Sequence, residues 1–446
     1  MLSDYVVLYA PGLAEMAADV AGKCGARHVM CCSEVGVGTE PDALYWQHFP
    51  SSDPDLKLRI DVVRDAHVVF LMSHERELFF EQHALISFLQ RFNVPRPLPE
   101  YAKGKWKESL ADGEVDECSV ASLTIVIPWY RHCQMERVSR WAVANGKWYN
   151  GKADGEFVDV PTAQAFAALL SAAPMPGKAT PPPLQLLLLD IHEYIDLENT
   201  LNATRRWANR KVKYDFALGS GTYFASPLRH FLSSVLCPLL TDVTTAFVVF
   251  PDHGAHRRFS TMVELHMPGI PKTNILWITK SRVGAAVSQA DGFNYADAEG
   301  KTHVLSDSFP DGASVLIADD FTNSGSTLFG GAAIIRRHST GSLRVRAYVT
   351  HFVAQYAKAK IDKFIDTLYA DDAALDEFHC SDTVCGIVSE LTKQSAARVA
   401  SGQPQKVFVT PVAPIVSDWI AANPPPSPSS EGCEQATSRL QAAVLS

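Results

Sequence analysis

Short runs of apolar and β-branched residues alternate along the chain with longer stretches whose apolar residues recur at helical spacing. The short runs have the length of strands, and their nearly continuous apolar character is typical of parallel strands buried on both faces. We therefore predict an α/β class, with mostly parallel sheets flanked by helices. The predicted strands are Tyr5–Tyr9, His67–Met72, Leu123–Ile127, Leu186–Asp190, Ala246–Phe250, Asn274–Ile278, Val315–Ala318 and Arg344–Thr350. The predicted helices include Gly12–Gly22, Phe79–Phe92, Pro161–Ala172 and Leu328–Arg337.

The chain is long enough for two domains. Its 446 residues exceed what one ordinary core accommodates, since a domain usually holds about 100–200 residues. A proline- and glycine-rich segment, Ala173–Leu184, leads into the apolar run that ends at Asp190. We expect an N-terminal domain over residues 1–195, a C-terminal domain over residues 196–421, and a flexible tail rich in proline and serine over residues 422–446.

Composition narrows the classes of function. The formal net charge is −9 and the basic residues occur in short clusters, so binding to nucleic acid through a continuous basic face is not expected. No apolar run reaches the roughly 18 residues of a membrane span, and the first residues lack the basic flank of a signal peptide. The nine cysteines include no CxxC pair, which favours reduced thiols. These features favour a cytoplasmic globular enzyme without membrane contact.

The most informative segment runs from Val315 to Gly330, VLIADDFTNSGSTLFG. It predicts a strand, then two acids, then a loop of small residues that opens a helix. Ligands of open α/β sheets lie beyond the carboxyl ends of strands, and a helix N-terminus offers free amides and a positive dipole to an anion. Asp319 and Asp320 can accept hydrogen bonds from a vicinal diol such as that of ribose, and the loop hydroxyls add donors. Taken alone, the segment is also compatible with an ordinary capped helix beside two solvated acids.

This segment resembles the phosphoribosyl-diphosphate (PRPP) motif, in which two acids and three variable residues precede a turn of Thr or Ser, Gly, Gly or Ser, and Thr. Type I phosphoribosyltransferases and PRPP synthetases share the motif. The resemblance implies a phosphoribosyltransferase-like fold and a site for ribose 5-phosphate. The residues that it assigns to this ligand are Asp319, Asp320, Asn323, Ser324, Gly325, Ser326 and Thr327.

Three further segments, in the expected order, resemble PRPP synthetases, and in particular their divergent plant-type class. They are a strand-Asp-x-His element at 188–192, a P-D-x-G turn at 250–258 and a strand that ends in K-x-R at 277–284. The resemblance implies that His192 and Asp252 hold the Mg²⁺ of the ATP complex, and that the catalytic residues Lys280 and Arg282 close over the transferred group. By themselves, these residues are equally read as a surface histidine, a plain β-turn and solvated charges.

The N-terminal half carries two weaker likenesses, to the ATP-binding segments of the same family. The candidate ATP-binding residues are Phe49, Ser51, Asp53, Gln134 and Glu136. Phe49 can stack on adenine, or it is one more core aromatic. Both segments depart from the family pattern, because Gln134 stands where an ATP-binding Arg is usual and Asn323 where many members have a third acid. The plant-type class also lacks that Arg and that acid.

The resemblance implies a ribose-phosphate diphosphokinase, which transfers the β,γ-diphosphoryl group of ATP to ribose 5-phosphate and so makes PRPP and AMP with Mg²⁺ as cofactor. It also implies two similar phosphoribosyltransferase-like domains, the first serving ATP and the second ribose 5-phosphate, and a homo-oligomer. Two alternatives stay open. One is a PRPP-using phosphoribosyltransferase, which needs a single α/β domain. The other is a catalytically silent PRPP synthetase-like subunit that regulates an active homologue.

Overall fold

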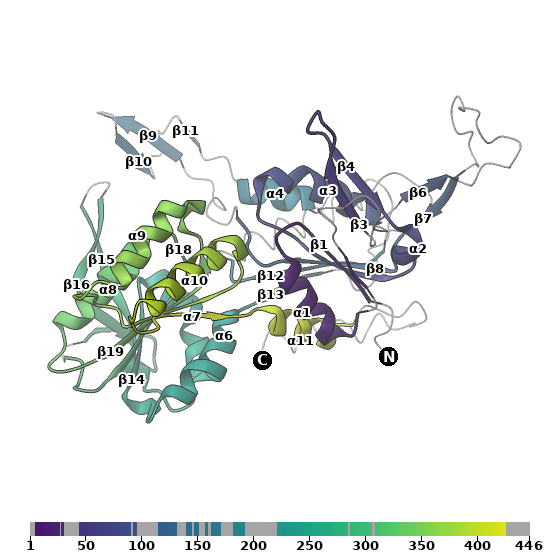
Figure 1. Ribbon diagram of the computed structural model, residues 1–446. Helices are drawn as coiled ribbons and strands as arrows, with labels where there is room; N and C mark the ends of the chain where they lie inside the picture. Colours follow the sequence, from purple (N-terminus) through teal and green to yellow (C-terminus); the bar gives the residue numbers. More distant parts are fainter. Residues whose placement is uncertain are drawn as a thin grey trace, which may run out of the picture.

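The structure is a computed structural model that describes residues 5–26, 28–30, 44–90, 92–95, 115–131, 140–144, 147–150, 157–158, 162–170, 182–191, 221–283, 286–305 and 308–424. Within these ranges the chain forms two α/β units, each built on one large sheet (Figure 1). The first unit is the sheet that contains the N-terminal strand, with the helices packed on it. The second unit is the sheet that contains the predicted phosphate loop, with its own helices.

The sheet of the first unit has six described strands in the order β13-β12-β8-β5-β1-β2, and all their pairings are parallel. Side chains alternate between the two faces of a strand, so each strand supplies two cores. Val6 and Leu8 enter one core, while Tyr5 and Val7 enter the other. The strands are β1 (Tyr5–Tyr9), β2 (His28–Met30), β5 (His67–Leu71), β8 (Ser122–Ile127), β12 (Leu184–Leu189) and β13 (Gly221–Ala225).

Helices cover both faces of this sheet. α3 (Phe79–Gln90) and α4 (Thr162–Leu170) pack on one face, and α1 (Ala14–Cys24) packs on the other. A hairpin, β3 (Leu44–His48) and β4 (Pro54–Leu58), is tied to α3 by a contact of 2.8 Å between His48 Nε2 and Glu81 Oε1. The smaller elements are α2 (Ile60–Val63), β6 (Phe92–Pro95), β7 (Val115–Cys118), β9 (Arg140–Ala144), β10 (Lys147–Asn150) and β11 (Phe157–Val158).

The sheet of the second unit has the strand order β17-β16-β15-β14-β18-β19-β20-β21. The strands from β15 to β21 in this order run parallel, whereas β16 and β17 join one edge in antiparallel pairings. The strands are β14 (Ala246–Phe250), β15 (Ile275–Val283), β16 (Ala286–Ala296), β17 (Thr302–Val304), β18 (Ser314–Thr322), β19 (Arg344–Phe352), β20 (Glu377–Ser381) and β21 (Val407–Thr410).

Two sets of helices enclose the second sheet. α8 (Ser326–Arg337), α9 (Lys358–Leu368) and α10 (Cys385–Ala400) pack on the face that holds Val315 and Ile317. α6 (Pro227–His230), the π-helical turn that follows it and α7 (His253–His266) pack on the face that holds Leu316 and Ala318. The alternation within β18 therefore places the end of this strand between two helical layers.

The two units share their cores. α11 (Ala413–Ala422) follows the last strand of the second sheet, yet it packs beside α1, and its Val416 and Ile420 belong to the core of the first unit (Figure 1). Val353 and Val384, which follow strands of the second sheet, enter the core on the opposite face of the first sheet. The expected boundary at residue 195 stays a prediction, and β13 lies in the first sheet although it comes after that residue.

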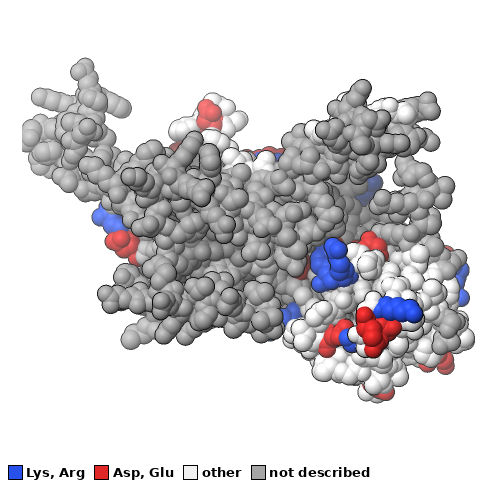
Figure 2. All heavy atoms as spheres, turned by 180° about the vertical axis from the view of Figure 1, so that it is seen from behind, with Lys and Arg blue, Asp and Glu red and all other residues white. Residues whose placement is uncertain are grey.

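The α/β class and the eight predicted strands are confirmed, as are the four predicted helices. Several boundaries differ, most of all at β15, which runs five residues past the predicted end at Ile278, and at β18, which runs four residues past the predicted end at Ala318. None of the helices in the described ranges has the length and apolar character that crossing a bilayer requires. On the face seen in Figure 2, basic and acidic side chains of the second unit lie side by side, in keeping with the scattered charges of the sequence.

Candidate functional site

The acidic pair lies within the last residues of β18, where the carboxyl end of the second sheet faces the first unit. Because neighbouring strand residues point to opposite faces, Asp319 and Asp320 enter different surroundings. The Asp319 side chain is half-buried, whereas Asp320 is 1% exposed. The Asp320 amide donates a hydrogen bond of 3.0 Å to Asp319 Oδ1. The two acids are therefore adjacent in β18 but differ in exposure.

Arg258 of α7 holds Asp320. Its Nη1 donates to Asp320 Oδ2 at 2.5 Å, and both side chains are buried. The same helix begins at Asp252, whose Oδ1 accepts a hydrogen bond of 2.9 Å from the Ala255 amide as an N-cap. The P-D-x-G turn thus supplies a capping acid at its start and the clamping arginine two turns later. No role was predicted for Arg258 from the sequence, although it is the last residue of the P-D-x-G segment at 250–258.

Carboxylates crowd this end of the sheet. Burial raises the pKa of Asp319 well above its usual range, and the neighbouring charges of Asp320 and Asp252 raise it further, while Arg258 opposes them. One guanidinium thus faces more than one carboxylate. Such an excess of hard oxygen ligands is what a divalent cation relieves. No group of three ligating side chains occurs among the described residues, and His192, which the resemblance adds to this set, lies outside them.

The loop after β18 has the backbone of an anion site. Gly325 adopts φ 73° and starts α8, its amide donates to Thr322 Oγ1 at 3.1 Å, and a Cβ atom there would lie 2.5 Å from the Phe364 ring. The hydroxyls of Ser324 and Ser326 are exposed and 3.0 Å apart. The glycine is therefore required by both conformation and space, and the open helix N-terminus presents amides and hydroxyls to solvent.

A fourth carboxylate reaches the same junction from the first unit. Asp190 follows β12, and its Oδ2 accepts a hydrogen bond of 2.5 Å from Thr350 Oγ1 at the end of β19. His351 Nε2 lies 3.1 Å from the carbonyl oxygens of both Leu189 and Asp190. Burial raises the pKa of Asp190 to about 6 and lowers that of His351 to about 4. The carboxyl ends of the two sheets are thus joined by hydrogen bonds at the acidic cluster.

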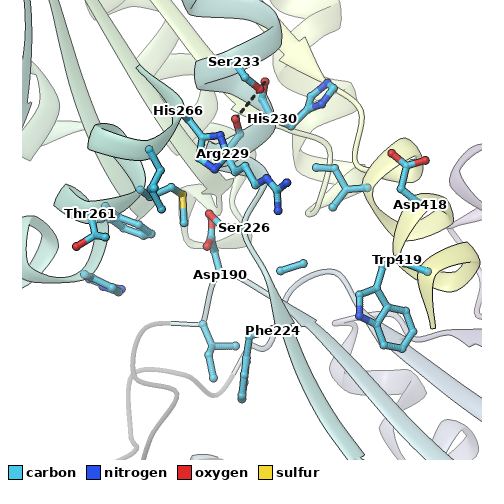
Figure 3. Close-up of a pocket in the computed structure, with 18 of the residues that line it drawn as sticks. Asp190, Phe224, Ser226, Arg229, His230, Ser233, Thr261, His266, Asp418 and Trp419 are labelled. Atoms are coloured by element: carbon cyan, nitrogen blue, oxygen red, sulfur yellow. Dashed lines mark hydrogen bonds between the residues drawn. The ribbon is translucent and has the colours of Figure 1, made fainter. Parts of the chain in front are cut away.

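Asp190 also lies at the floor of a cavity of about 840 Å³ on the other side of the junction. Figure 3 shows Asp190 beside Ser226, with Arg229 above them and Trp419 of α11 on the opposite wall. Arg258 lines this cavity as well.

Comparisons with known proteins agree with this arrangement. No family model matches the chain. It is 23% identical over 370 residues to ribose-phosphate pyrophosphokinase 4 of Arabidopsis thaliana, covering 80% of this chain and 81% of that protein. It is 25% identical over 339 residues to the protein of the same name from Oryza sativa subsp. japonica, covering 74% and 75% of the two chains. A crystal structure of the phosphoribosylpyrophosphate synthetase from Mycobacterium smegmatis superposes with a TM-score of 0.55 at 15% identity, and covers 94% of this chain and 98% of that one.

The chain is similar to PRPP synthetases. The identities to the plant proteins extend through both units, and the structural match shows that the chain shares the phosphoribosyltransferase-like fold of the solved synthetase.

Lys280 and Arg282 of this PRPP synthetase-like chain lie in a strand. They belong to the outer part of β15, which pairs with β16 across a register shift between Ile278 and Lys280. β15 pairs with β14 through Ile275, Leu276 and Trp277, so the K-x-R segment extends past its parallel neighbour. The predicted strand ends at Ile278, whereas β15 continues to Val283 and forms one arm of a hairpin with β16.

The candidate ATP-binding residues of the PRPP synthetase-like chain divide into two groups. Phe49 is 52% exposed at the tip of the β3–β4 hairpin, where its amide donates to the Asp53 carbonyl at 2.8 Å. Ser51 Oγ donates to Asp53 Oδ2 at 2.8 Å. These side chains line none of the cavities described here. Gln134 and Glu136 lie outside the described residues.

Two adjoining cavities lie where the first unit meets the loop after β18. The larger, of about 580 Å³, has mainly apolar walls that include Phe79 and Phe166. The smaller, of about 190 Å³, includes Asn323 of the predicted ribose 5-phosphate site. Arg76, Trp129 and Arg131 line both cavities. Trp129 and Arg131 belong to the segment around Gln134 that resembles an ATP-binding segment of the family, whereas Arg76 carried no such signal in the sequence.

Proposed function

We propose that the chain is a ribose-phosphate diphosphokinase, which makes PRPP and AMP from ATP and ribose 5-phosphate. The observation that carries the proposal is the glycine-dependent anion loop directly after an acidic strand end, placed at the junction of two units. A single-domain phosphoribosyltransferase would leave the second large sheet without a role. The same resemblance supports a cytoplasmic homo-oligomer, and both features are part of the proposal.

In this proposal the loop binds the acceptor. The amides and hydroxyls of Ser324–Thr327 hold the 5-phosphate, because a helix N-terminus stabilises an anion. Asp319 accepts hydrogen bonds from the ribose hydroxyls. Asp320 is held by Arg258 and sets the position of Asp319 through the backbone that they share. Asn323 completes the side of the pocket nearest the first unit.

The transferred group is stabilised by charge. Lys280 and Arg282 close over the β-phosphoryl group as the anomeric hydroxyl attacks it in line and AMP leaves. Their place on a projecting hairpin supports a role in closure, since the β15–β16 arm extends beyond the sheet. Most of the rate enhancement then comes from positioning and charge neutralisation, without a strong general base.

The carboxylates at the junction fit Mg²⁺. Asp252 and Asp319 are close enough that the charge of the first raises the pKa of the second, and the resemblance adds His192 to the set. When bound, the cation neutralises phosphate oxygens of the donor. The contribution of the chain is to hold hard oxygen ligands at the end of β18 and at the N-terminus of α7.

The decisive experiment is AMP release from Mg-ATP and ribose 5-phosphate by the purified chain. We expect turnover by the wild type and a loss of about 100-fold or more in kcat for Lys280→Ala, because one charge contact to the transferred group is removed. The thermal unfolding of the variant should match that of the wild type. Lys301→Ala, at an exposed position between β16 and β17, is the matched control.

Other outcomes identify the alternatives. A wild type that releases no AMP, yet changes the rate of an active PRPP synthetase mixed with it, is a silent regulatory subunit. Release of diphosphate from PRPP and a nucleobase identifies a phosphoribosyltransferase.

A further inference from the structure

The donor segment, residues 127–131 of the stretch that resembles an ATP-binding segment of the family, packs directly against the second unit. Its Trp129 is 4% exposed, and the centre of the indole lies 4.3 Å from the ring centre of His351 and 6.0 Å from that of Phe321. Trp129 Nε1 also donates a hydrogen bond of 2.6 Å to the hydroxyl of Tyr356. All three partners of Trp129 belong to the unit that carries the predicted acceptor loop.

Tyr356 holds a second residue of the donor segment. Arg131 Cζ lies 3.8 Å from the centre of the Tyr356 ring, and Arg131 Nη1 donates to the His74 carbonyl oxygen at 3.2 Å. The His74 ring packs on the same tyrosine, with ring centres 5.4 Å apart. Burial, together with the charge of Arg131, lowers the pKa of His74 to about 4, so Arg131 is the charged member of this group at pH 7. One side chain of the second unit thus supports both Trp129 and Arg131.

The backbone at Tyr356 is unusual. Ala354, Gln355 and Tyr356 have φ values of 46°, 51° and 55°, a left-handed turn that non-glycine residues rarely form. Backbone of this kind persists only where the surrounding structure specifies it, and it occurs preferentially at functional sites. Here the turn directs the ring and hydroxyl of Tyr356 toward the first unit, where they meet Arg131 and Trp129.

The left-handed turn is joined directly to the acceptor loop. It follows β19, which pairs with β18 along its length. The Val353 amide donates to the Thr322 carbonyl oxygen at 3.0 Å, and Thr322 Oγ1 accepts the hydrogen bond of 3.1 Å from the Gly325 amide at the start of α8. A short chain of hydrogen bonds therefore connects the loop that is predicted to hold the 5-phosphate with the turn that carries Tyr356.

In-line transfer requires donor and acceptor to be placed accurately relative to each other, because a shift of about 1 Å can cost about 100-fold in rate. In the proposed reaction the two substrates bind on different units. We propose that Tyr356 is a positioning residue, which sets the donor segment of the first unit against the acceptor loop of the second through its contacts with Trp129 and Arg131. The inference rests on the proposed function, and it adds a residue that no motif of the sequence marked.

The test compares Tyr356→Phe with the wild type in AMP release, and in the binding of Mg-ATP alone and of ribose 5-phosphate alone by calorimetry. The variant keeps the ring beside Arg131 but loses the hydrogen bond to Trp129, so kcat should fall by about tenfold. The Kd of each substrate alone should change less than about twofold, because Tyr356 contacts neither of them in this role. Tyr356→Leu, which also removes the ring, should lose about 100-fold in kcat.

Two further variants separate positioning from stability. Tyr369→Phe, the matched control, removes a hydroxyl hydrogen bond of 2.7 Å to Ser395 in the core of the second unit. It should lower the temperature of thermal unfolding and leave kcat unchanged. Trp129→Phe removes the hydrogen bond to Tyr356 from the other side. Combined with Tyr356→Phe, it should reduce kcat no further than the stronger of the two single variants.

The inference and the proposed function fail in different ways. A wild type that makes AMP, with an unchanged kcat in Tyr356→Phe, overturns the inference and keeps the function, whether or not the variant is less stable. Mg-ATP binding to Tyr356→Phe that is weaker by about tenfold or more also overturns it, since Tyr356 would then be part of the donor site itself. Additive effects of Tyr356→Phe and Trp129→Phe on kcat overturn the link between the two residues. A wild type that makes no AMP removes the proposed function, and the positioning role with it.

Discussion

The second sheet carries opposite balances of charge at the two ends of its strands. Where the parallel strands begin, Glu377 is surrounded by Arg344, Arg346 and His379, with a hydrogen bond of 2.7 Å from Arg346 Nε. Where they end, Arg258 faces Asp320, and Asp319 lies beside it. The first end has more cationic partners than carboxylates, and the second end has more carboxylates than cations.

The pKa values follow this difference. The hydrogen bond from His379 and those from the two arginines hold the pKa of Glu377 far below its usual range, against the effect of burial. At the other end of the strands, burial and neighbouring carboxylates raise the pKa of Asp319. The end where Glu377 has several cationic partners stabilises the fold by itself, whereas the end where one arginine faces several carboxylates is prepared for a cation or a substrate. The same kind of residue thus serves structure at one end of a strand and function at the other.

Removal of the arginine at the carboxylate-rich end of the strands should have the largest effect. Arg258→Met deprives the buried Asp320 of its ion pair with Arg258, so we expect a loss of about 3–5 kcal/mol in the free energy of unfolding. The measurement is urea unfolding at pH 7. Arg257→Met, at the exposed preceding residue of α7, is the control and should stay within about 0.5 kcal/mol of the wild type.

A second substitution sharpens this result. Asp320→Asn in the Arg258→Met background removes the charge that Arg258 no longer balances and should recover part of the lost stability. If the double variant is less stable by the sum of the two single effects, the arginine does not act through Asp320.

Glu377→Gln tests the end where the strands begin. We expect a loss of about 3 kcal/mol at pH 7, because the buried Arg346 and the exposed Arg344 both lose their acceptor charge. A carboxylate with a lowered pKa contributes stability above its ordinary value of 4.5, and that contribution is lost as the pH falls. The gap between wild type and variant in urea unfolding should therefore close below about pH 4.

The exposed pair of Asp366 with Arg398 supplies the control for this variant. Asp366→Asn should cost less than about 1 kcal/mol. If Glu377→Gln is as stable as the wild type at pH 7, the comparison between the two ends of the strands is wrong.

Asp190→Asn should give the smallest effect, and of the opposite sign. Burial raises the pKa of Asp190 to about 6 from an ordinary value of 3.8, so the folded state favours the protonated acid and the wild type loses stability as the pH rises through this interval. The variant should therefore gain about 2–3 kcal/mol relative to the wild type between pH 4 and pH 7. Asp382, whose pKa burial also raises to about 6, titrates in both proteins and cancels. Parallel pH profiles would show that Asp190 does not carry this penalty.

The sequence predicted what local patterns determine. The strands of both sheets are continuous apolar runs, and the phosphate loop is a contiguous motif whose glycine requirement the structure explains through φ and the Phe364 ring. β20 was missed because its sequence, EFHCS, places polar side chains in buried positions, where Glu377 and His379 are hydrogen-bonded to each other.

Contacts across long sequence separations could not be predicted in this way. Arg257 and Arg258 are adjacent, and the phase of α7 alone decides which of them reaches Asp320. Asp190 meets Thr350 because the carboxyl ends of two separate sheets face each other. The position of Arg131 depends on the left-handed turn at Tyr356, which contains no glycine and so could not be predicted from the sequence.

The packing of α11 against α1 determines when the first unit can finish folding during synthesis. The first unit begins at β1, yet one face of its sheet is completed by Val416 and Ile420, which the ribosome adds after the whole second sheet. The N-terminal half therefore emerges with an apolar face that stays incomplete until α11 is made, and contacts of such long sequence separation form slowly. During synthesis this exposed face favours aggregation unless a chaperone binds it, and a chain released before α11 would keep it exposed.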